Sequence, residues 1–149
     1  MLTTRTYGSR IALEGSIDDT ANVLAVLDHA KNHQLALDLG GVRFINSIGV
    51  REWIRMLAAA AKQKTAIALH RVAVVVVHQM NLVPAARGGQ VNSFMAPYIC
   101  EECDAEREFE LTPAEAKAGP KEPPQQCVEC KSGMVLRDPC AIYFAFLQA

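Results

Sequence analysis

The fold of this chain is decided by residues 35–62, which read LALDLGGVRFINSIGVREWIRMLAAAAK. The first five residues form a compact apolar run that is typical of a buried strand. Gly40 and Gly41 then punctuate the chain, and residues 42–46 read as a loop. After this loop, apolar residues recur at helical spacing, so we expect an amphipathic helix with Asn46 or Ser47 at its N-cap. Its apolar stripe comprises Val50, Trp53, Ile54, Leu57, Ala58 and Ala61.

The flanking segments alternate between strand and helix signals. Residues 5–17 read as two extended runs around a turn at Gly8 and Ser9, and residues 65–69 and 90–94 read as further strands. The acids Asp18 and Asp19 predict the first turn of a helix that ends near residue 32. Residues 72–83 stay ambiguous, because their valines favour a strand by propensity while their spacing also fits a helix face. Such alternation predicts an α/β fold with a mixed, largely parallel sheet and helices mainly on one face.

Composition excludes several classes of protein. The chain has 149 residues, half of them hydrophobic, and a net charge of −1, so bulk attraction to nucleic acid or to an anionic membrane is not expected. No apolar run reaches the roughly 18 residues that a membrane span needs. The first residues show no secretory signal, and the cysteine pattern suits a reducing compartment, so we expect a cytoplasmic protein.

Two Cys-x-x-Cys pairs dominate the last third of the chain. Cys100 with Cys103 and Cys127 with Cys130 are separated by 23 residues, a pattern typical of a zinc ribbon with one structural Zn²⁺. Thiol redox chemistry and an iron centre are the alternatives. Lys131 to Gly133 predict a tight turn that directs N–H groups at sulfur. Residues 97–149 would then form a small β module after a first domain of residues 1–96.

Other parts of this module are less regular. Residues 134–136 and 142–147 read as strands, and residues 112–126 read as an exposed loop, because they hold four of the seven prolines. The fifth cysteine, Cys140, has apolar neighbours and suggests ordinary burial.

Two stretches of the first domain resemble one family. Residues 13–21, LEGSIDDTA, and residues 37–50, LDLGGVRFINSIGV, look like the two signature segments of STAS domains, the class that includes bacterial anti-sigma factor antagonists. The resemblance covers roughly residues 5–95. It implies a small mixed sheet with helices on one side, and a helix over residues 72–83.

The resemblance also implies a switch. In the family, the serine or threonine that matches Ser47 is phosphorylated by a partner kinase, and Asn46 stands where Asp is common. Asp18, Asn46, Ile48 and Gly49 would then belong to the partner-binding surface. From the residues alone, Ser47 also reads as a helix cap, and the acids at 18 and 19 read as complements to a helix dipole. Gly49 suggests close approach of a partner or of a neighbouring backbone.

We therefore expect a non-enzymatic regulatory protein-binding module whose partner is an anti-sigma factor or a serine kinase-like protein. The alternatives are a zinc-ribbon nucleic-acid-binding or scaffold protein, and a small enzyme with a CxxC redox centre. Glutamates at five of the ten positions 101–110 argue against nucleic acid, because they repel phosphates. The sequence leaves the oligomeric state open.

Overall fold

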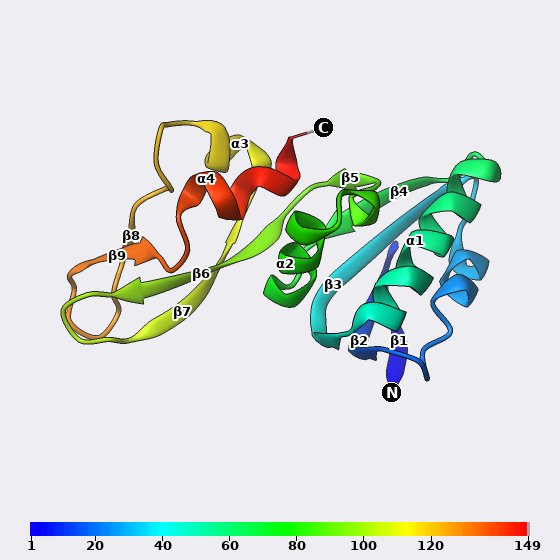
Figure 1. Cartoon of the computed structure of the whole chain (residues 1–149), viewed down its shortest axis with the longest axis horizontal. Coiled ribbons are helices and arrows are strands. Elements are labelled where there is room, and N and C mark those ends of the chain that lie inside the picture. The colour runs from blue at the N-terminus through cyan, green and yellow to red at the C-terminus, as the bar shows by residue number, and fades with distance from the viewer. Residues whose placement is uncertain (149) are drawn as a thin grey trace.

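A computed structural model describes residues 1–148 and contains two β-sheets (Figure 1). The first sheet has the strand order β1-β2-β3-β4-β5, and the second has the order β7-β6-β9-β8. The strands are β1 (Leu2–Tyr7), β2 (Arg10–Ile17), β3 (Gln34–Ile45), β4 (Ala66–His70), β5 (Gln90–Val91), β6 (Phe94–Cys100), β7 (Glu106–Leu111), β8 (Gln125–Gln126) and β9 (Gly133–Leu136). β1 and β2 form an antiparallel hairpin, whereas β2 to β5 run parallel to one another. All pairs in the second sheet are antiparallel. The chain is therefore a mixed α/β protein.

Short helices connect and cover these strands. They are η1 (Val23–His29), α1 (Ser47–Lys62), α2 (Val74–Leu82), η2 (Pro84–Ala86), α3 (Pro113–Lys117), α4 (Cys140–Tyr143) and η3 (Phe144–Leu147), where η marks a 3₁₀-helix. The expected helix from Ser47 is confirmed, and so is a helix within residues 72–83.

One face of the first sheet carries the core. Leu35, Leu37 and Leu39 of β3 are buried, and the residues between them are partly exposed. The connections through η1, α1 and α2 each step in the same direction across the sheet. Because such crossovers are right-handed, they place these helices on one face. Trp53 of α1 is buried there, and its Nε1 donates to the Ala86 carbonyl at 3.0 Å.

The expected helix start at Asp18 and Asp19 is wrong. Asp18 Oδ1 accepts hydrogen bonds from the Thr20 N–H at 2.9 Å and from the Thr20 hydroxyl at 2.6 Å. This side chain closes a local turn, which competes with helix formation. The 3₁₀-helix starts only at Val23, with Asn22 as its cap and no acid in its first turn.

Gly40 and Gly41 do not end their strand, because β3 continues to Ile45. The missing side chain of each glycine instead allows a neighbouring side chain to pack directly against the backbone of β3. A Cβ on Gly40 would lie 2.2 Å from an Arg71 guanidinium nitrogen, and one on Gly41 would lie 2.7 Å from Glu14 Cγ. The register of β2 on β3 shifts between Ala12 and Glu14, so this part of the ladder is irregular.

The C-terminal segment also differs from the prediction. Residues 142–147 form the end of α4 and η3 rather than a strand. This winding brings the rings of Tyr143, Phe144 and Phe146 to centroid distances of 6.4, 5.8 and 5.2 Å from Phe94, the first residue of β6. A strand would send neighbouring rings to opposite faces, whereas the helical turns gather all three on one ring.

Two smaller differences concern residues 90–94 and 112–126. The last strand of the first sheet is only Gln90–Val91, and Phe94 already starts β6. The expected loop contains α3, which begins with a capping box between Thr112 and Glu115, and also β8.

The expected boundary after residue 96 falls inside β6. Buried residues on both sides of it belong to one continuous hydrophobic core. The division into residues 1–96 and 97–149 stays a prediction.

Candidate functional site

Four cysteines meet at the tip of the second sheet, which lies at the left of Figure 1. Cys100 ends β6, Cys127 follows β8, and Cys130 lies three positions before the start of β9. The structure thus brings together all four predicted metal ligands.

The two Cys-x-x-Cys loops have the same backbone geometry. The Cys100 N–H donates to the Ala105 carbonyl at 2.8 Å, and the Asp104 N–H donates to the Cys100 carbonyl at 2.8 Å. The second loop repeats both hydrogen bonds. The Cys127 N–H donates to the Ser132 carbonyl at 2.8 Å, and the Lys131 N–H donates to the Cys127 carbonyl at 3.0 Å. Asp104 and Lys131 both have a positive φ, at 60° and 69°. Two matching turns that face each other are what a four-thiolate site requires.

The sulfur positions fit a metal ion. All four Sγ atoms lie within 4.8 Å of one another, with Cys100 to Cys130 at 3.4 Å and Cys103 to Cys127 at 3.7 Å. Tetrahedral bonds of about 2.3 Å to zinc would separate the sulfurs by roughly 3.8 Å. Cys100 and Cys127 are buried, and Cys103 and Cys130 are exposed. The cluster is therefore compatible with a metal ion held by four sulfurs.

Two thiols of the cluster have shifted pKa values. Hydrogen bonds from Ser132 lower the pKa of Cys130 to about 6. At Cys103, the hydrogen bond from the Ala105 backbone lowers the pKa, but the neighbouring thiols outweigh it and raise the pKa to about 12. A divalent cation bound at the cluster would compensate the negative charge of the thiolates.

Cys140 lies outside the cluster. It is partly exposed, and its Sγ donates a weak hydrogen bond to the Pro120 carbonyl at 3.7 Å. Its burial is thus only partial.

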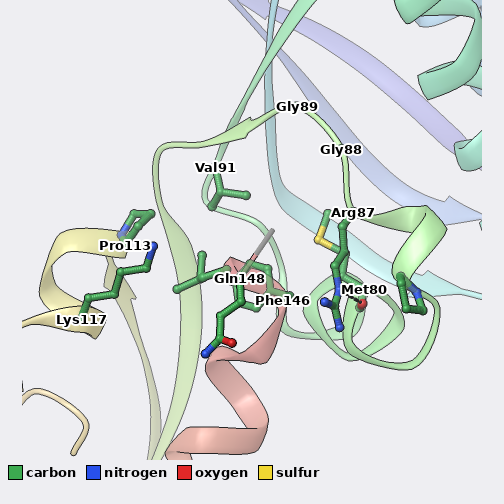
Figure 2. A pocket seen from close by; sticks show the side chains of 11 residues that line it. Met80, Arg87, Gly88, Gly89, Val91, Pro113, Lys117, Phe146 and Gln148 are labelled. Atoms are coloured by element: carbon green, nitrogen blue, oxygen red, sulfur yellow. Dashed lines mark hydrogen bonds between the residues drawn. The ribbon is translucent and has the colours of Figure 1, made fainter. Parts of the chain in front are cut away.

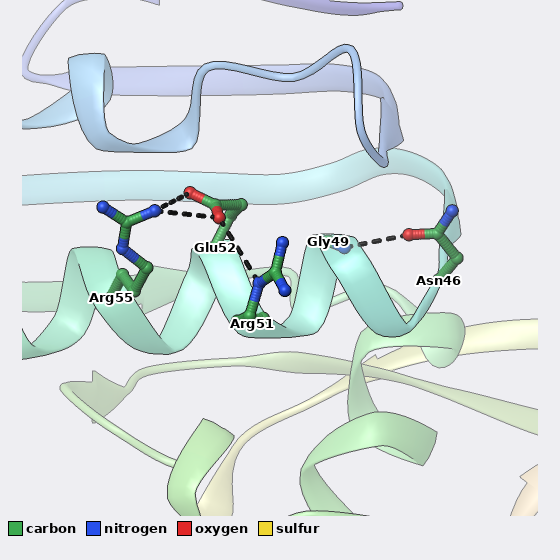
Figure 3. Close-up of polar contacts among 5 residues, drawn as sticks. All are labelled: Asn46, Gly49, Arg51, Glu52 and Arg55. Atoms are coloured by element: carbon green, nitrogen blue, oxygen red, sulfur yellow. Dashed lines mark hydrogen bonds and ion pairs between the residues drawn. The ribbon is translucent and has the colours of Figure 1, made fainter.

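The second candidate site is the start of α1. Asn46 Oδ1 accepts a hydrogen bond from the Gly49 N–H at 2.9 Å, so Asn46 is the N-cap (Figure 3). Ser47 is the first helical residue and is exposed. Within residues 1–148 its hydroxyl has no hydrogen-bond partner. The serine is therefore not the cap, and its hydroxyl is accessible.

The end of β2 lies directly against this helix start. The Asn46 N–H donates to the Ile17 carbonyl at 3.3 Å, and a Cβ on Gly49 would lie 1.8 Å from the same oxygen. Gly49 is buried, so the close approach that its sequence suggests is to neighbouring backbone. Asp18 follows Ile17 and is thereby brought near Ser47. The hydrogen bonds from Thr20 lower the pKa of Asp18 below its ordinary value.

Exposed apolar and cationic side chains lie within four positions of Ser47 in the sequence. Phe44 and Ile48 are 50% and 38% exposed, although both are large and apolar. Arg51, one turn further along α1, lies 3.7 Å from Glu52, which also binds Arg55 at 3.1 Å (Figure 3). We call Asp18, Phe44, Ser47, Ile48 and Arg51 the Ser47 surface. Sequence reasoning missed Phe44 and Arg51, because it placed Phe44 in a loop and assigned no role to Arg51.

A separate cavity of about 470 Å³ lies where α3 and η3 approach the first sheet (Figure 2). It is lined by apolar residues that include Met80, Val91 and Phe146, together with Arg87 and Lys117. Arg87 is already engaged, since its Nε donates to the Met80 carbonyl at 2.6 Å and its Nη2 to the Asn81 carbonyl at 3.4 Å. These bonds cap the C-terminal end of α2, which explains Arg87 without a ligand.

Comparison with known proteins identifies no family. No family model matches the chain, and no curated protein matches it. Among residues 1–148, no helix has both the length and the apolar character needed to cross a membrane. The resemblance to STAS domains rests on the two sequence segments.

Proposed function

We propose that this chain is a non-enzymatic regulatory module of the STAS type that binds a protein partner through the Ser47 surface. Phosphorylation of Ser47 switches this binding. The observation that carries the proposal is that the helix cap and the exposed hydroxyl belong to different residues. Asn46 caps α1, and Ser47 is left exposed with a free hydroxyl among exposed apolar side chains.

The helix start tolerates a phosphate. A phosphoryl group adds about −1.5 to −2 charges at neutral pH. It would lie at the N-terminal end of a sixteen-residue helix, where the dipole favours negative charge. Arg51 lies one turn away on the same helix, at the i, i+4 spacing that lets opposite charges meet. The modified protein therefore stays folded, and the new charge acts on docking instead.

The partner class follows from the resemblance and from the surface. An anti-sigma factor or a serine kinase-like protein would offer an apolar patch to Phe44 and Ile48, and its active site would reach Ser47. Exposed aromatic and arginine side chains are typical anchors of such interfaces. Four reduced thiols suit the cytoplasm as the compartment.

The experiment compares partners of the tagged wild type, Ser47→Asp and Ser9→Asp in the cells of origin. Ser9 is an exposed serine in the hairpin turn between β1 and β2 and serves as the matched control. We expect a specific protein to co-purify with the wild type and with Ser9→Asp, and to be lost with Ser47→Asp. An identical set of partners for all three proteins would contradict the proposal.

For the cysteine cluster we propose one structural Zn²⁺. Four sulfur ligands form a closed shell with no open position for a substrate, which favours a structural over a catalytic role. Metal analysis of the purified chain should give one zinc per molecule, and Cys103→Ser should reduce this content. Iron at the same stoichiometry, or reactive thiols at all four positions, would reject zinc.

A nucleic-acid-binding ribbon is the alternative function. β7 carries exposed glutamates at 106, 108 and 110, and the first of them lies opposite Ile99, the residue before Cys100. These carboxylates would repel a phosphate backbone. We expect no binding of DNA or RNA in a fluorescence anisotropy titration at low salt. Salt-dependent binding that is lost after charge reversal at Lys131 would favour the alternative.

A further inference from the structure

The four outer edges of the two sheets differ in how they are protected. β5 and β8 are edge strands of only two residues each. β7 is an edge strand of six residues that carries three glutamates and one arginine. Short length and charge are the usual means by which proteins block pairing with other chains. These three edges are therefore protected against pairing with strands of other chains.

β1 is the exception. It has six residues, LTTRTY, with three threonines and no proline, and five of the six are exposed. It pairs with β2 along its whole length without a register shift, so no bulge interrupts the edge. Threonine and tyrosine favour strands. This edge is long, regular and accessible.

The single charged side chain of β1, Arg5, does not protect this edge against strand pairing. Arg5 Nη1 donates to the Tyr7 hydroxyl at 2.8 Å, and Arg5 Nε lies 3.9 Å from Glu14 of β2. Its guanidinium carbon also lies 5.8 Å from the centre of the Tyr7 ring. These contacts hold the side chain over its own sheet, where it meets a carboxylate of its own chain.

We propose that β1 pairs antiparallel with β1 of a second copy of this chain, across a two-fold axis at Thr4. The partner's chemistry is thus the same backbone edge. In this arrangement Thr4 faces Thr4 of the second copy, Thr3 faces Arg5, and Leu2 faces Thr6. Opposite residues in an antiparallel ladder share one face of the sheet, and the axis keeps the helix-covered faces of both copies on the same side.

Charge and apolar exposure select this register. Centring the pair on Arg5 would set two arginines opposite each other, which is destabilising. Centring it on Thr4 brings Met1 opposite Tyr7 of the second copy, at both ends of the contact. These two side chains are 85% and 53% exposed, and sulfur packs favourably against aromatic rings. The same register therefore covers two of the most exposed apolar side chains near β1.

The dimer leaves both candidate sites accessible. β1 lies at one edge of the first sheet, and the chain leaves for the cysteine module from the other edge, at β5 (Figure 1). The start of α1 follows β3 in the middle of the sheet. Pairing through β1 is thus independent of the proposed phosphorylation, and either can fail without the other.

The test uses the full chain in its metal-loaded form and measures its mass in solution by sedimentation equilibrium over a range of concentrations. We expect a reversible dimer for the wild type. Thr4→Lys sets like charges opposite each other at the axis and should weaken the dimer by at least about tenfold. Gln90→Lys, on the opposite edge of the same sheet, should leave it unchanged. Circular dichroism and thermal melts verify that Thr4→Lys is folded.

Hydrogen exchange locates the interface. Amides of residues 2–7 should gain protection as the wild-type concentration rises, and Thr4→Lys should lose this gain. A monomer at every concentration would overturn the proposal. So would an intact dimer of a folded Thr4→Lys, or protection that rises with concentration only outside β1.

Discussion

At the scale of single residues, the start of α1 depends on three nearby positions with different roles. Asn46 caps the helix, Ser47 presents its hydroxyl, and Gly49 allows the helix to touch the Ile17 carbonyl. The cap and the accessible hydroxyl belong to different residues, so modification of Ser47 need not cost the cap. This separation is what makes a switch at this position physically reasonable.

Gly49→Ala tests the close contact. The added Cβ would lie 1.8 Å from a backbone oxygen of β2, which cannot move aside without displacing the strand. We expect a loss of about 1–3 kcal/mol in the free energy of unfolding, measured by urea denaturation. Gly119→Ala is the control, because no atom lies within 4 Å of its added Cβ. Equal stability of both variants would show that the contact is not tight.

Asn46→Asp tests the cap itself. Asp keeps a side-chain oxygen for the Gly49 N–H and adds a negative charge at the helix N-terminus. We therefore expect a gain of about 0.3–1 kcal/mol in the free energy of unfolding, whereas Asn46→Ala should lose about 1 kcal/mol. The gain should shrink at high salt. Thermal melts of the three proteins at two salt concentrations provide the measurement, and a destabilising Asp would reject this role for Asn46.

At the scale of elements, the C-terminal segment ties the second sheet back to the first. Tyr143 donates its hydroxyl hydrogen to the Met95 carbonyl at 2.5 Å, and Asn81 Nδ2 donates to the Tyr143 carbonyl at 3.0 Å. His78 Nε2, on α2, lies 3.3 Å from Asp138 Oδ2. Asp138 directly precedes Pro139, which is the N-cap of α4. Together with the aromatic rings around Phe94, these contacts fix α4 and η3 on α2 and β6.

Truncating Phe146 tests this attachment. The side chain is buried, with its ring 5.2 Å from that of Phe94, so Phe146→Ala should cost about 3–5 kcal/mol of unfolding free energy. Phe44→Ala removes the same atoms from a residue that is 50% exposed and should cost far less. On our proposal, Phe44→Ala instead weakens partner binding. Comparable destabilisation by both substitutions would contradict the assigned burial.

At the scale of the whole molecule, the first sheet supplies a stable core and the cysteine cluster organises the far end of the second sheet. β8 and β9 are short, with two and four residues, and they flank the second cysteine loop. So few ladder contacts give little stability on their own, and the proposed metal would supply the remainder.

Metal removal should therefore act locally at first. We expect a chelator to release hydrogen-exchange protection in β8, β9 and the cysteine loops, while β2 to β4 and α1 keep theirs. Added zinc should restore the protection. Loss of protection across the entire chain at once would show that the metal supports the first sheet as well.

The sequence predicted the parts of this molecule that depend on local pattern. Apolar periodicity located α1, the Cys-x-x-Cys spacing located the cluster, and Asn46 was one of the two expected caps. Two of the errors arose where tertiary contacts overrode local signals. Gly40 and Gly41 read as a break, yet they lie inside β3, where Arg71 and Glu14 approach too closely to leave room for a Cβ. The segment 142–147 reads as a strand, yet packing on Phe94 winds it into helical turns.

The most direct test of the central claim is the position of phosphate on the protein. Wild type and Ser47→Ala are incubated with ATP in an extract of the cells of origin, and intact mass and fragment spectra are recorded. Our account predicts one phosphoryl group on the wild type, located at Ser47, and none on Ser47→Ala. An unmodified wild type, or phosphate at another residue with Ser47 untouched, would contradict it.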